Sequence, residues 1–297
     1  MKAEEGARLV ELTRVTDGAG FVLADRDPAD KLGLNGGKKA VQAMLAAGIA
    51  RLAEMQDKLY ALNRWSVLTV FQAMDAGGKD SAIKHVMSGV NPQGCQVFSF
   101  KAPSDEELDH DFLWRCLRRL PERGRIGIFN RSYYEEVLVV RVHPELLDRQ
   151  RLPDGLIGGG IWAERFEDIR AMERYLARNG TAIVKLFLNV SKEEQLRRFC
   201  DRLERPDKHW KFDPSDLESR GEWDRYMAAY EDMIRNTATP HAPWYVIPAD
   251  DKWVCRAAVA AALIATMEPL GLRYPPVTPA QAKAIEAARR TLHKQGS

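Results

Sequence analysis

Residues 66–84 carry the side chains best suited to chemistry. Their first part, residues 67–71, is an apolar, β-branched run with the length of a buried parallel strand. A turn of small residues, Ala76-Gly77-Gly78, follows it, and residues 79–86 begin a helix at Lys79. In this layout the loop amides and the helix dipole attract anions, and the lysine adds a point charge. The stretch therefore predicts a phosphate-binding loop.

The loop departs from the common pattern G-x-x-x-x-G-K-[ST]. Ala73 replaces the first glycine, Asp80 stands where the magnesium-binding hydroxyl is expected, and Ser81 comes one residue late. Asp75 places a carboxylate inside the loop, which suits a phosphate site if it holds a cation that bridges phosphates. The alternative is a glycine-rich turn with a surface lysine and a capping aspartate.

A second group of polar residues follows the predicted strand 125–130. In open parallel sheets, ligands bind beyond the carboxyl ends of the strands, so Asn130 and Arg131 should lie beside the phosphate loop. Glu135 and Glu136 would repel an anion there unless a metal or a nucleotide base and ribose lies between them. The alternatives are a capping asparagine with a solvated arginine, and an i,i+4 ion pair between Arg131 and Glu135.

A third group is basic and occupies residues 197–211. Three arginines recur every three or four residues along one helical face until Pro206 breaks the helix, and two lysines continue the charge. A surface helix accounts for the first half, whereas a mobile lid that folds cations over phosphates accounts for both halves. The group consists of Arg198, Arg202, Arg205, Lys208 and Lys211.

The chemistry that fits these groups is phosphoryl transfer. The six histidines are scattered, and neither a Ser/His/Asp arrangement nor a metal-spaced histidine cluster is evident. Phosphoryl transfer needs neither, because cations and in-line positioning stabilise its transition state. An acceptor that is itself a phosphate is largely ionised at neutral pH, so a general base is dispensable.

The composition allows one large α/β domain. The 297 residues are 45% hydrophobic with a formal charge of only +2, so basic character must be local. The four cysteines form no C-x-x-C pair, which argues against a zinc site or disulfide framework and for a reducing cytoplasm. The chain starts with a charged segment, so no secretory signal is expected, and the apolar tract 257–267 is too short to span a bilayer.

Helical and strand-like segments alternate along the chain, which predicts a parallel three-layer α/β sheet. Residues 1–36 are polar and rich in Gly and Asp, so we expect an irregular arm. The strands are expected at 67–71, 97–100, 125–130, 182–190 and 244–247. The helices are expected at 38–62, 79–86, 111–120, from 131, 161–178, from 192, 216–236, 252–267 and 279–293.

Three stretches together resemble the polyphosphate kinase type 2 family: residues 72–80 (QAMDAGGKD), 129–135 (FNRSYYE) and 202–211 (RLERPDKHWK) with 214–216. Residues 242–244 and 249–252 are similar to its C-terminal pattern. The resemblance covers about residues 38–270. It implies a three-layer P-loop kinase-like fold with a helical lid, and magnesium-dependent phosphoryl transfer between inorganic polyphosphate and nucleotides.

The resemblance also assigns roles to residues. The expected catalytic residues are Asp75, Lys79, Arg131, Arg198 and Arg202. Those expected to bind polyphosphate are Ala76, Gly77, Gly78, Lys79, Asp80, Ser81, Lys84, Arg202 and Lys208. Those expected to bind the nucleotide are Asn130, Arg131, Glu135, Glu136, Lys208 and Lys211. Mg²⁺, with Mn²⁺ as the alternative, is expected at Asp75, Asn130 and Glu135.

Asn130 stands where many family members have aspartate, and with Glu135 it resembles the subgroup that phosphorylates both nucleoside monophosphates and diphosphates. Glu135 is the residue expected to permit the monophosphate acceptor. The resemblance gives an irregular arm (1–36), a P-loop kinase-like domain (37–275, lid about 198–215) and a C-terminal helix (276–297). It also implies adenine nucleotides, with guanine nucleotides as an alternative, as substrates, a cytoplasmic homo-oligomer (dimer or tetramer), and no nucleic-acid or membrane partner.

Two other functions remain open. An ATP-dependent nucleoside monophosphate kinase would share the loop, the lid and the sheet. The extended basic set, including Lys84, Arg118 and Arg119, favours a long polyanion over compact ATP. A non-catalytic nucleotide-binding module would bind without turnover, and Asp75 with the lid arginines argues against it.

Overall fold

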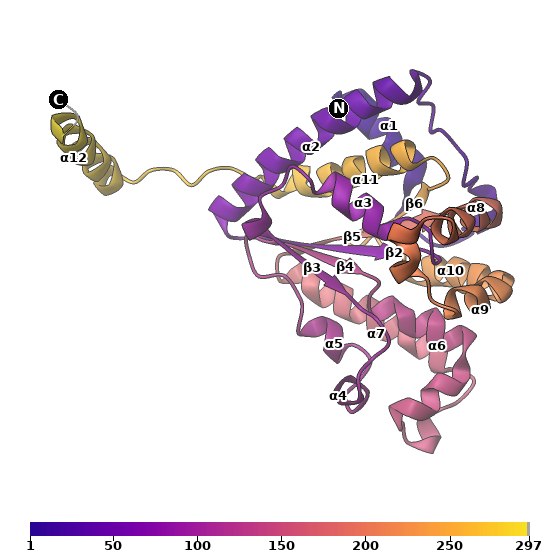
Figure 1. Cartoon of the computed structure of the whole chain (residues 1–297). Helices are drawn as coiled ribbons and strands as arrows, with labels where there is room; N and C mark the ends of the chain where they lie inside the picture. Colours follow the sequence, from indigo (N-terminus) through magenta and orange to yellow (C-terminus); the bar gives the residue numbers. More distant parts are fainter. Residues whose placement is uncertain (296–297) are drawn as a thin grey trace.

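The computed structural model describes residues 1–295, and within them six strands form one sheet in the order β1-β6-β5-β2-β4-β3 (Figure 1). All neighbouring strands run parallel except β1, which pairs antiparallel with β6. This confirms the predicted parallel α/β sheet. The strands are β1 Arg14–Val15, β2 Ser66–Gln72, β3 Cys95–Ser99, β4 Ile126–Asn130, β5 Thr181–Asn189 and β6 Trp244–Pro248.

Helices cover both faces of the sheet, which gives three layers (Figure 1). One face carries α1 Ala3–Thr13, α2 Gly37–Leu62, α3 Lys79–Val86 and α11 Lys252–Met267. The other carries α6 Val139–Val142, α7 Ile161–Arg178 and α10 Trp223–Thr237. The remaining α-helices are α4 Asp105–Leu108, α5 Trp114–Leu117, α8 Lys192–Leu203, α9 Ser215–Gly221 and α12 Pro279–Gln295. Short 3₁₀ helices are η1 Leu23–Asp25, η2 Pro92–Gly94, η3 Tyr133–Val137, η4 Pro144–Gln150, η5 Asp154–Leu156, η6 Pro206–Lys211 and η7 Glu268–Leu270.

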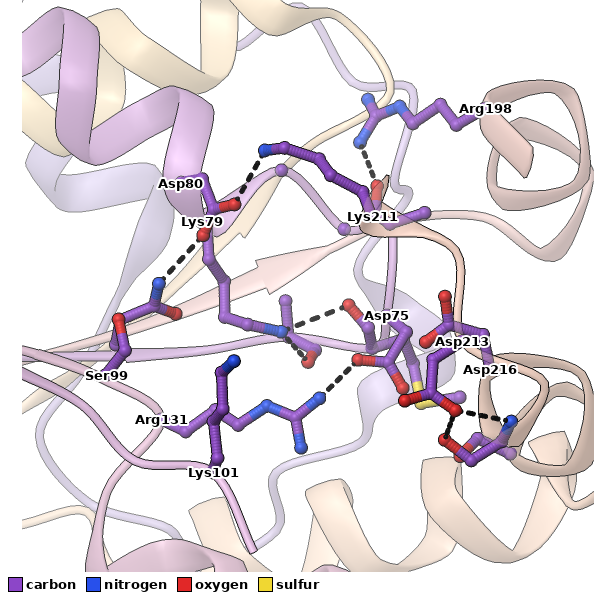
Figure 2. Close-up of a pocket in the computed structure, with 18 of the residues that line it drawn as sticks. Asp75, Lys79, Asp80, Ser99, Lys101, Arg131, Arg198, Lys211, Asp213 and Asp216 are labelled. Carbon is purple, nitrogen blue, oxygen red and sulfur yellow. Dashed lines mark hydrogen bonds and ion pairs between the residues drawn. The ribbon is translucent and has the colours of Figure 1, made fainter. Parts of the chain in front are cut away.

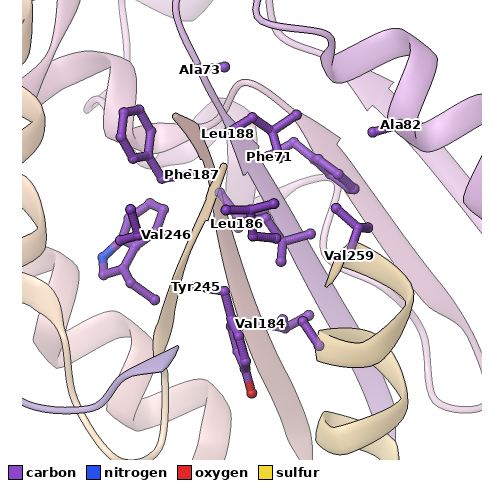
Figure 3. Close-up of a cluster of buried hydrophobic side chains, with 14 of the residues drawn as sticks. Phe71, Ala73, Ala82, Val184, Leu186, Phe187, Leu188, Tyr245, Val246 and Val259 are labelled. Carbon is purple, nitrogen blue, oxygen red and sulfur yellow. The ribbon is translucent and has the colours of Figure 1, made fainter. Parts of the chain in front are cut away.

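Apolar side chains from both faces of the central strands form the core. Every residue of β2 is buried, as expected for a strand covered on both sides. Val259 of α11 lies on one side of the sheet, near Phe71, whereas Phe187 and Val246 point to the other side (Figure 3). There the ring of Phe187 stacks on Tyr230 of α10, with centroids 4.4 Å apart. Because side chains alternate along the strands, those on each face of the sheet pack against one of the two helical layers.

Helix α11 is the most deeply buried helix of the core. Residues Lys252–Leu270 have a mean hydropathy of 1.4 and, by length and composition, could cross a membrane; the stretch is thus longer than the tract 257–267 considered from the sequence. However, 67% of its apolar window is buried inside the protein. It packs against α1, α2 and α3. Its apolar character is thus explained by the core.

The prediction of an irregular N-terminal arm is wrong for residues 3–15. They form α1 and β1, and Leu9 and Val15 are buried in the core. The sequence signal is weak because α1 is stabilised by tertiary burial against α11 rather than by a long apolar pattern.

Three predicted helices also differ from the structure. The segment 111–120 keeps only α5, the helix expected from residue 131 is the 3₁₀ helix η3 followed by α6, and the segment 216–236 is interrupted at Glu222 between α9 and α10. The predicted final helix is present as α12. None of its residues is buried, and it extends away from the sheet at the end of an extended segment (Figure 1).

A buried ion pair supports the turn that follows β4. Lys185 of β5 and Glu173 of α7 are both fully buried, with Nζ and Oε2 2.8 Å apart. Lys185 also donates to the hydroxyl of Tyr134, and Glu173 accepts hydrogen bonds from the hydroxyls of Tyr133 and Tyr134, each at 2.8–2.9 Å. Because both tyrosines belong to η3, this network fixes the turn that carries Glu135.

We predict that Lys185→Met lowers the free energy of unfolding by about 3–5 kcal/mol, because it leaves the Glu173 carboxylate buried without its cation. Denaturant titration followed by circular dichroism measures the change. Lys283→Met, which removes a lysine from the exposed helix α12, is the matched control and should stay within about 0.5 kcal/mol. Equal stability of the two variants would contradict the role given to the pair.

Candidate active site

A cavity of about 1130 Å³ lies beyond the carboxyl ends of the parallel strands. It is lined by the loop after β2, by Asn130 and Arg131 after β4, and by Ala249 and Lys252 after β6. Residues of α8, η6 and α9 line it from the opposite side. The register explains the meeting, because Phe71 of β2 pairs with Asn130 of β4 and so both strands end at the same level. The cavity is therefore where a parallel sheet is expected to bind a ligand.

The loop after β2 has the backbone of a phosphate-binding loop. Ala76 and Gly78 both have left-handed backbone conformations, with φ of 58° and 102°, and Gly78 directly precedes the first residue of α3. These turns bring the α3 N-terminus, with its unpaired amides, to the cavity. Gly78 avoids the strain that a side chain would suffer at its φ.

Lys79 is a buried cation to which no carboxylate of residues 1–295 is bonded. Its Nζ donates to the carbonyl oxygens of Ala73, at 2.6 Å, and Met74, at 3.3 Å (Figure 2). Burial, followed by the nearby positive charge of Arg131, lowers the pKa of Lys79. An anion in the cavity would oppose both effects and keep the ammonium protonated. The side chain is thus suited to bind a phosphate group.

Arg131 connects two acidic residues at the cavity. Its Nη2 lies 2.5 Å from Oδ1 of Asp75 (Figure 2). Its Nη1 lies 3.5 Å from Oε2 of Glu135. Glu135 first, and Asp75 as well, raise the pKa of Arg131 against the opposing effect of burial. The i,i+4 pair between Arg131 and Glu135 is therefore present, and both of its members line the cavity. The interpretation of Arg131 and Glu135 as an ion pair is therefore compatible with their interpretation as site residues.

Asp80, which replaces the usual hydroxyl residue, joins three elements. Its carboxylate accepts hydrogen bonds from Asn130 Nδ2 at 2.8 Å and from Lys211 Nζ at 3.0 Å (Figure 2). Burial alone would raise the pKa of Asp80, but the bonds to Lys211 and Asn130 lower it. An ionised aspartate at position 130 could not donate to this carboxylate, so the amide of Asn130 suits Asp80 better than a carboxylate would.

The two lid arginines predicted to be catalytic are held by protein groups. Arg198 donates to the carbonyl oxygen of Ala76 at 3.0 Å (Figure 2). It also donates to Glu194 at 2.7 Å and to the carbonyl oxygen of Ala249. This arginine thereby ties α8 to the phosphate loop and to the end of β6. Arg202 donates to Asp216 at 3.0 Å and so holds α8 against α9. Both residues line the cavity, but in this structure their hydrogen bonds connect protein elements to one another.

Two predicted residues lie outside the cavity. Lys84 of α3 is exposed and does not line it. Glu136 is buried and accepts hydrogen bonds from Arg165 at 3.0 Å and Gln150 at 2.8 Å. Burial raises the pKa of Glu136, although Arg165 and Gln150 oppose this. The cavity lining therefore does not support the expected phosphate contact of Lys84 or the expected nucleotide contact of Glu136, and both remain predictions.

All other predicted site residues line the cavity. They are Asp75, Ala76, Gly77, Gly78, Lys79, Asp80, Ser81, Asn130, Arg131, Glu135, Arg198, Arg202, Lys208 and Lys211. The structure adds lining residues that the sequence reasoning missed: Lys101, Tyr226, Tyr230, Lys252 and Arg256. Lys101 follows the end of β3, so the rule that ligands bind beyond the carboxyl ends of strands could have found it. No comparable signal marks the two tyrosines or Arg256.

The carboxylates of the cavity fit one mode of magnesium binding. Among residues 1–295, no three His, Cys, Asp or Glu side chains converge as a metal site. Mg²⁺, however, is commonly held through one or two carboxylates together with substrate phosphates and water. Asp75 and Glu135 lie on either side of Arg131 at the cavity and fit that mode. The protein alone forms no closed metal cage within the part described.

Comparison with known proteins identifies the family. The family model for Polyphosphate kinase 2 (PPK2) matches residues 36–271. The chain belongs to the polyphosphate kinase 2 family. This confirms the resemblance seen in the sequence motifs.

Relatives of this polyphosphate kinase 2 chain match over most of its length. It is 53% identical over 258 residues to an ADP-polyphosphate phosphotransferase of Rhodopseudomonas palustris, covering 86% of this chain and 89% of that one. It is 45% identical over 272 residues to an AMP/ADP-polyphosphate phosphotransferase of Meiothermus ruber, covering 92% and 98%. The crystal structure of polyphosphate kinase 2 from Arthrobacter aurescens TC1 superposes with a TM-score of 0.85 at 41% identity, covering 94% and 96%. The fold is therefore that of the family.

We predict that Asp80→Ala loosens η6, because Lys211 loses the carboxylate that holds it to α3. The pair is partly exposed, so protection of the amides of residues 206–211 against hydrogen exchange should fall only about 1.4- to 5-fold. Hydrogen exchange with mass spectrometry measures this. Asp207→Ala, which removes a carboxylate paired locally with Arg205, is the control that should leave α3 and Lys211 joined. Unchanged protection in Asp80→Ala would show that the pair does not hold the lid.

Proposed function

We propose that this chain transfers the terminal phosphoryl group of inorganic polyphosphate to both AMP and ADP, giving ADP and ATP in a reversible reaction. The polyphosphate-driven phosphorylation of nucleotides is the function of this polyphosphate kinase 2 member, and the use of both acceptors is the finer proposal. The observation that carries the site assignment is Lys79, a buried cation at the start of α3 that, within the described residues 1–295, is bonded only to carbonyl oxygens.

The proposed mechanism relies on positioning and charge. The amides at the N-terminus of α3 and the ammonium of Lys79 would bind the transferring phosphoryl group. Arg131, oriented by Asp75 and Glu135, would neutralise charge on the acceptor side. Lys208, which lines the cavity and forms no ion pair within residues 1–295, would add a cation from the lid. The acceptor phosphate is ionised at neutral pH, so no residue has to act as a general base.

Mg²⁺, or Mn²⁺ in its place, would be held by Asp75 and Glu135 together with substrate phosphates, and would neutralise phosphate charge there. Asn130 is less suited to this role because its amide already donates to Asp80. Its carbonyl oxygen remains a proposed ligand. Without substrate, Arg131 supplies the positive charge that the two carboxylates require.

We further propose a cytoplasmic homo-oligomer. The four cysteines are all free thiols, which is consistent with a reducing compartment. Guanine nucleotides remain proposed alternative acceptors.

The test is a matched assay with Mg²⁺ in which AMP or ADP is the acceptor and polyphosphate or ATP is the donor. Product from polyphosphate with AMP and with ADP supports the proposal. Product only from ATP with AMP would instead identify a nucleoside monophosphate kinase.

We predict that Lys79→Ala lowers kcat about 100-fold or more in this assay, because it removes a preorganised cation from the transferring group. Ordinary activity of the folded variant would contradict the site assignment.

We predict that Glu135→Asn harms phosphorylation of AMP and spares that of ADP. Glu135 lies beside Arg131 on the acceptor side, where the shorter AMP has to reach the donor without a second phosphate group. The kcat/KM values for the two acceptors, measured with the same polyphosphate, give the comparison. Glu145→Gln, at the edge of the same cavity, serves as a charge-matched control. An equal loss on AMP and ADP would reject the role of Glu135 in acceptor choice.

A further inference from the structure

Arg256 of α11 is a buried cation whose hydrogen bonds are mostly unmet. Its side chain lines the cavity, yet the residue is only 6% exposed. Among residues 1–295, the guanidinium makes a single hydrogen bond, from Nη2 to Ser81 Oγ at 2.8 Å. Its Nε is buried and has no partner in that part of the chain. Within residues 1–295 no carboxylate lies within ion-pair distance of Arg256, unlike the lid residues Arg198 and Arg202.

The surroundings of Arg256 disfavour its charge when the cavity is empty. Burial without a counterion is costly for a guanidinium and lowers the pKa of Arg256. Lys252 lies four residues earlier on the same face of α11, so the two positive charges repel each other. Both stand near the N-terminus of α11, where the helix dipole also opposes positive charge. The hydrogen bond to Ser81 and stacking on the ring of Trp253, 4.7 Å from the guanidinium carbon, compensate in part.

An anion bound at Arg256 would offset the cost of burial, the repulsion by Lys252 and the unfavourable helix dipole. It would accept a hydrogen bond from the orphan Nε, neutralise the two cations and satisfy the helix dipole. Arg256 could then act as a forked donor, which suits a phosphate group better than a single ammonium does. The arrangement therefore points to an anionic ligand rather than to a structural ion pair.

The position of Arg256 indicates which anion. The sheet order places β6 and β4 on opposite sides of β2, so α11, which follows β6, lies across the phosphate loop from Arg131 and Glu135. Through Ser81, Arg256 contacts the first turn of α3, whose N-terminus would bind the transferring phosphoryl group. If the acceptor nucleotide occupies the side of Arg131 and Glu135, the donor extends toward α11. In-line transfer requires donor and acceptor on opposite sides of the transferring group.

We propose that Arg256, with Lys252 and the hydroxyl of Ser81, forms a subsite for a non-transferring phosphate group of the polyphosphate donor. This rests on the proposed function of the same cavity. It also gives a role to Ser81, the hydroxyl that follows one residue later than in the common phosphate-loop pattern. Ser81 orients the guanidinium through its hydrogen bond.

The first experiment compares Arg256→Gln with the wild-type protein. With long-chain polyphosphate as donor, the KM for polyphosphate should rise about 10- to 100-fold, as expected for loss of a charged hydrogen-bond donor. The KM for ADP should change less than about 2-fold. Arg256→Lys, which keeps the charge but not the fork, should show a smaller rise. Arg273→Gln removes an exposed arginine outside the cavity and should leave both KM values unchanged.

Two results would overturn the subsite. A rise in the KM for ADP with an unchanged KM for polyphosphate would assign Arg256 to the nucleotide phosphates. Unchanged KM values in a variant that melts like the wild type would show that Arg256 does not bind the donor. If Arg256→Gln does not fold, Lys252→Gln decides, since Lys252 is exposed and removing it does not disturb the core. That variant should raise the KM for polyphosphate alone, and no change would reject the proposal.

A second measurement separates this proposal from the proposed function. Long-chain polyphosphate is titrated into wild-type and Arg256→Gln protein without nucleotide, and the heat of binding gives Kd. Weaker binding by the variant supports the subsite, and equal binding rejects it, even if the wild type shows no turnover with polyphosphate. Absence of turnover in the wild type would by itself overturn only the proposed function.

Discussion

The parallel register of β2 with β4 is the constraint on which the rest of the site depends. Because Val67 pairs with Ile126 and Phe71 with Asn130, the two strands end together. The phosphate loop and Arg131 are therefore neighbours although they are more than fifty residues apart in the sequence. A register shift of one residue would turn the side chains of β2 to the opposite face and misplace the loop. The buried pair of Lys185 and Glu173 then fixes η3, the turn that follows β4, through its bonds to Tyr133 and Tyr134.

The positive side chains around the cavity divide into two classes. Arg198 and Arg202 are bonded to carboxylates and carbonyl groups, so they hold the lid, the loop and the strand ends together. Lys79, Lys208 and Arg256 have no carboxylate bonded to them within residues 1–295 and line the same cavity. A net charge of +2 over the whole chain hides this division. The structure concentrates unpaired charge where a polyanion would lie.

The sequence predicts the strongly patterned elements well. The bounds of α3, α7 and α11 agree with the expected 79–86, 161–178 and 252–267, because each carries a clear apolar face or a cap. The rule that ligands bind beyond strand ends correctly brought together Asp75, Asn130 and Arg131. In contrast, α1 is stabilised by long-range packing that a local pattern does not contain.

Side-chain pairing was much harder to predict than location. Asp80 and Lys211 are 131 positions apart, so their ion pair depends on the folded lid. Glu135 and Glu136 are adjacent, and only the 3₁₀ turn decides that the first faces the cavity and the second faces Arg165. Arg256 stands out because its buried Nε has no hydrogen-bond acceptor within residues 1–295, and a sequence pattern does not show whether a side chain lacks a partner.

The hydrogen bond between Asn130 and Asp80 couples these two positions energetically. An aspartate at position 130 would face the carboxylate of Asp80, and two such charges at contact repel by about 1–4 kcal/mol near a protein surface. Position 80 would then favour a residue without negative charge. The effect of a substitution at position 80 or 130 on the site therefore depends on the residue present at the other position.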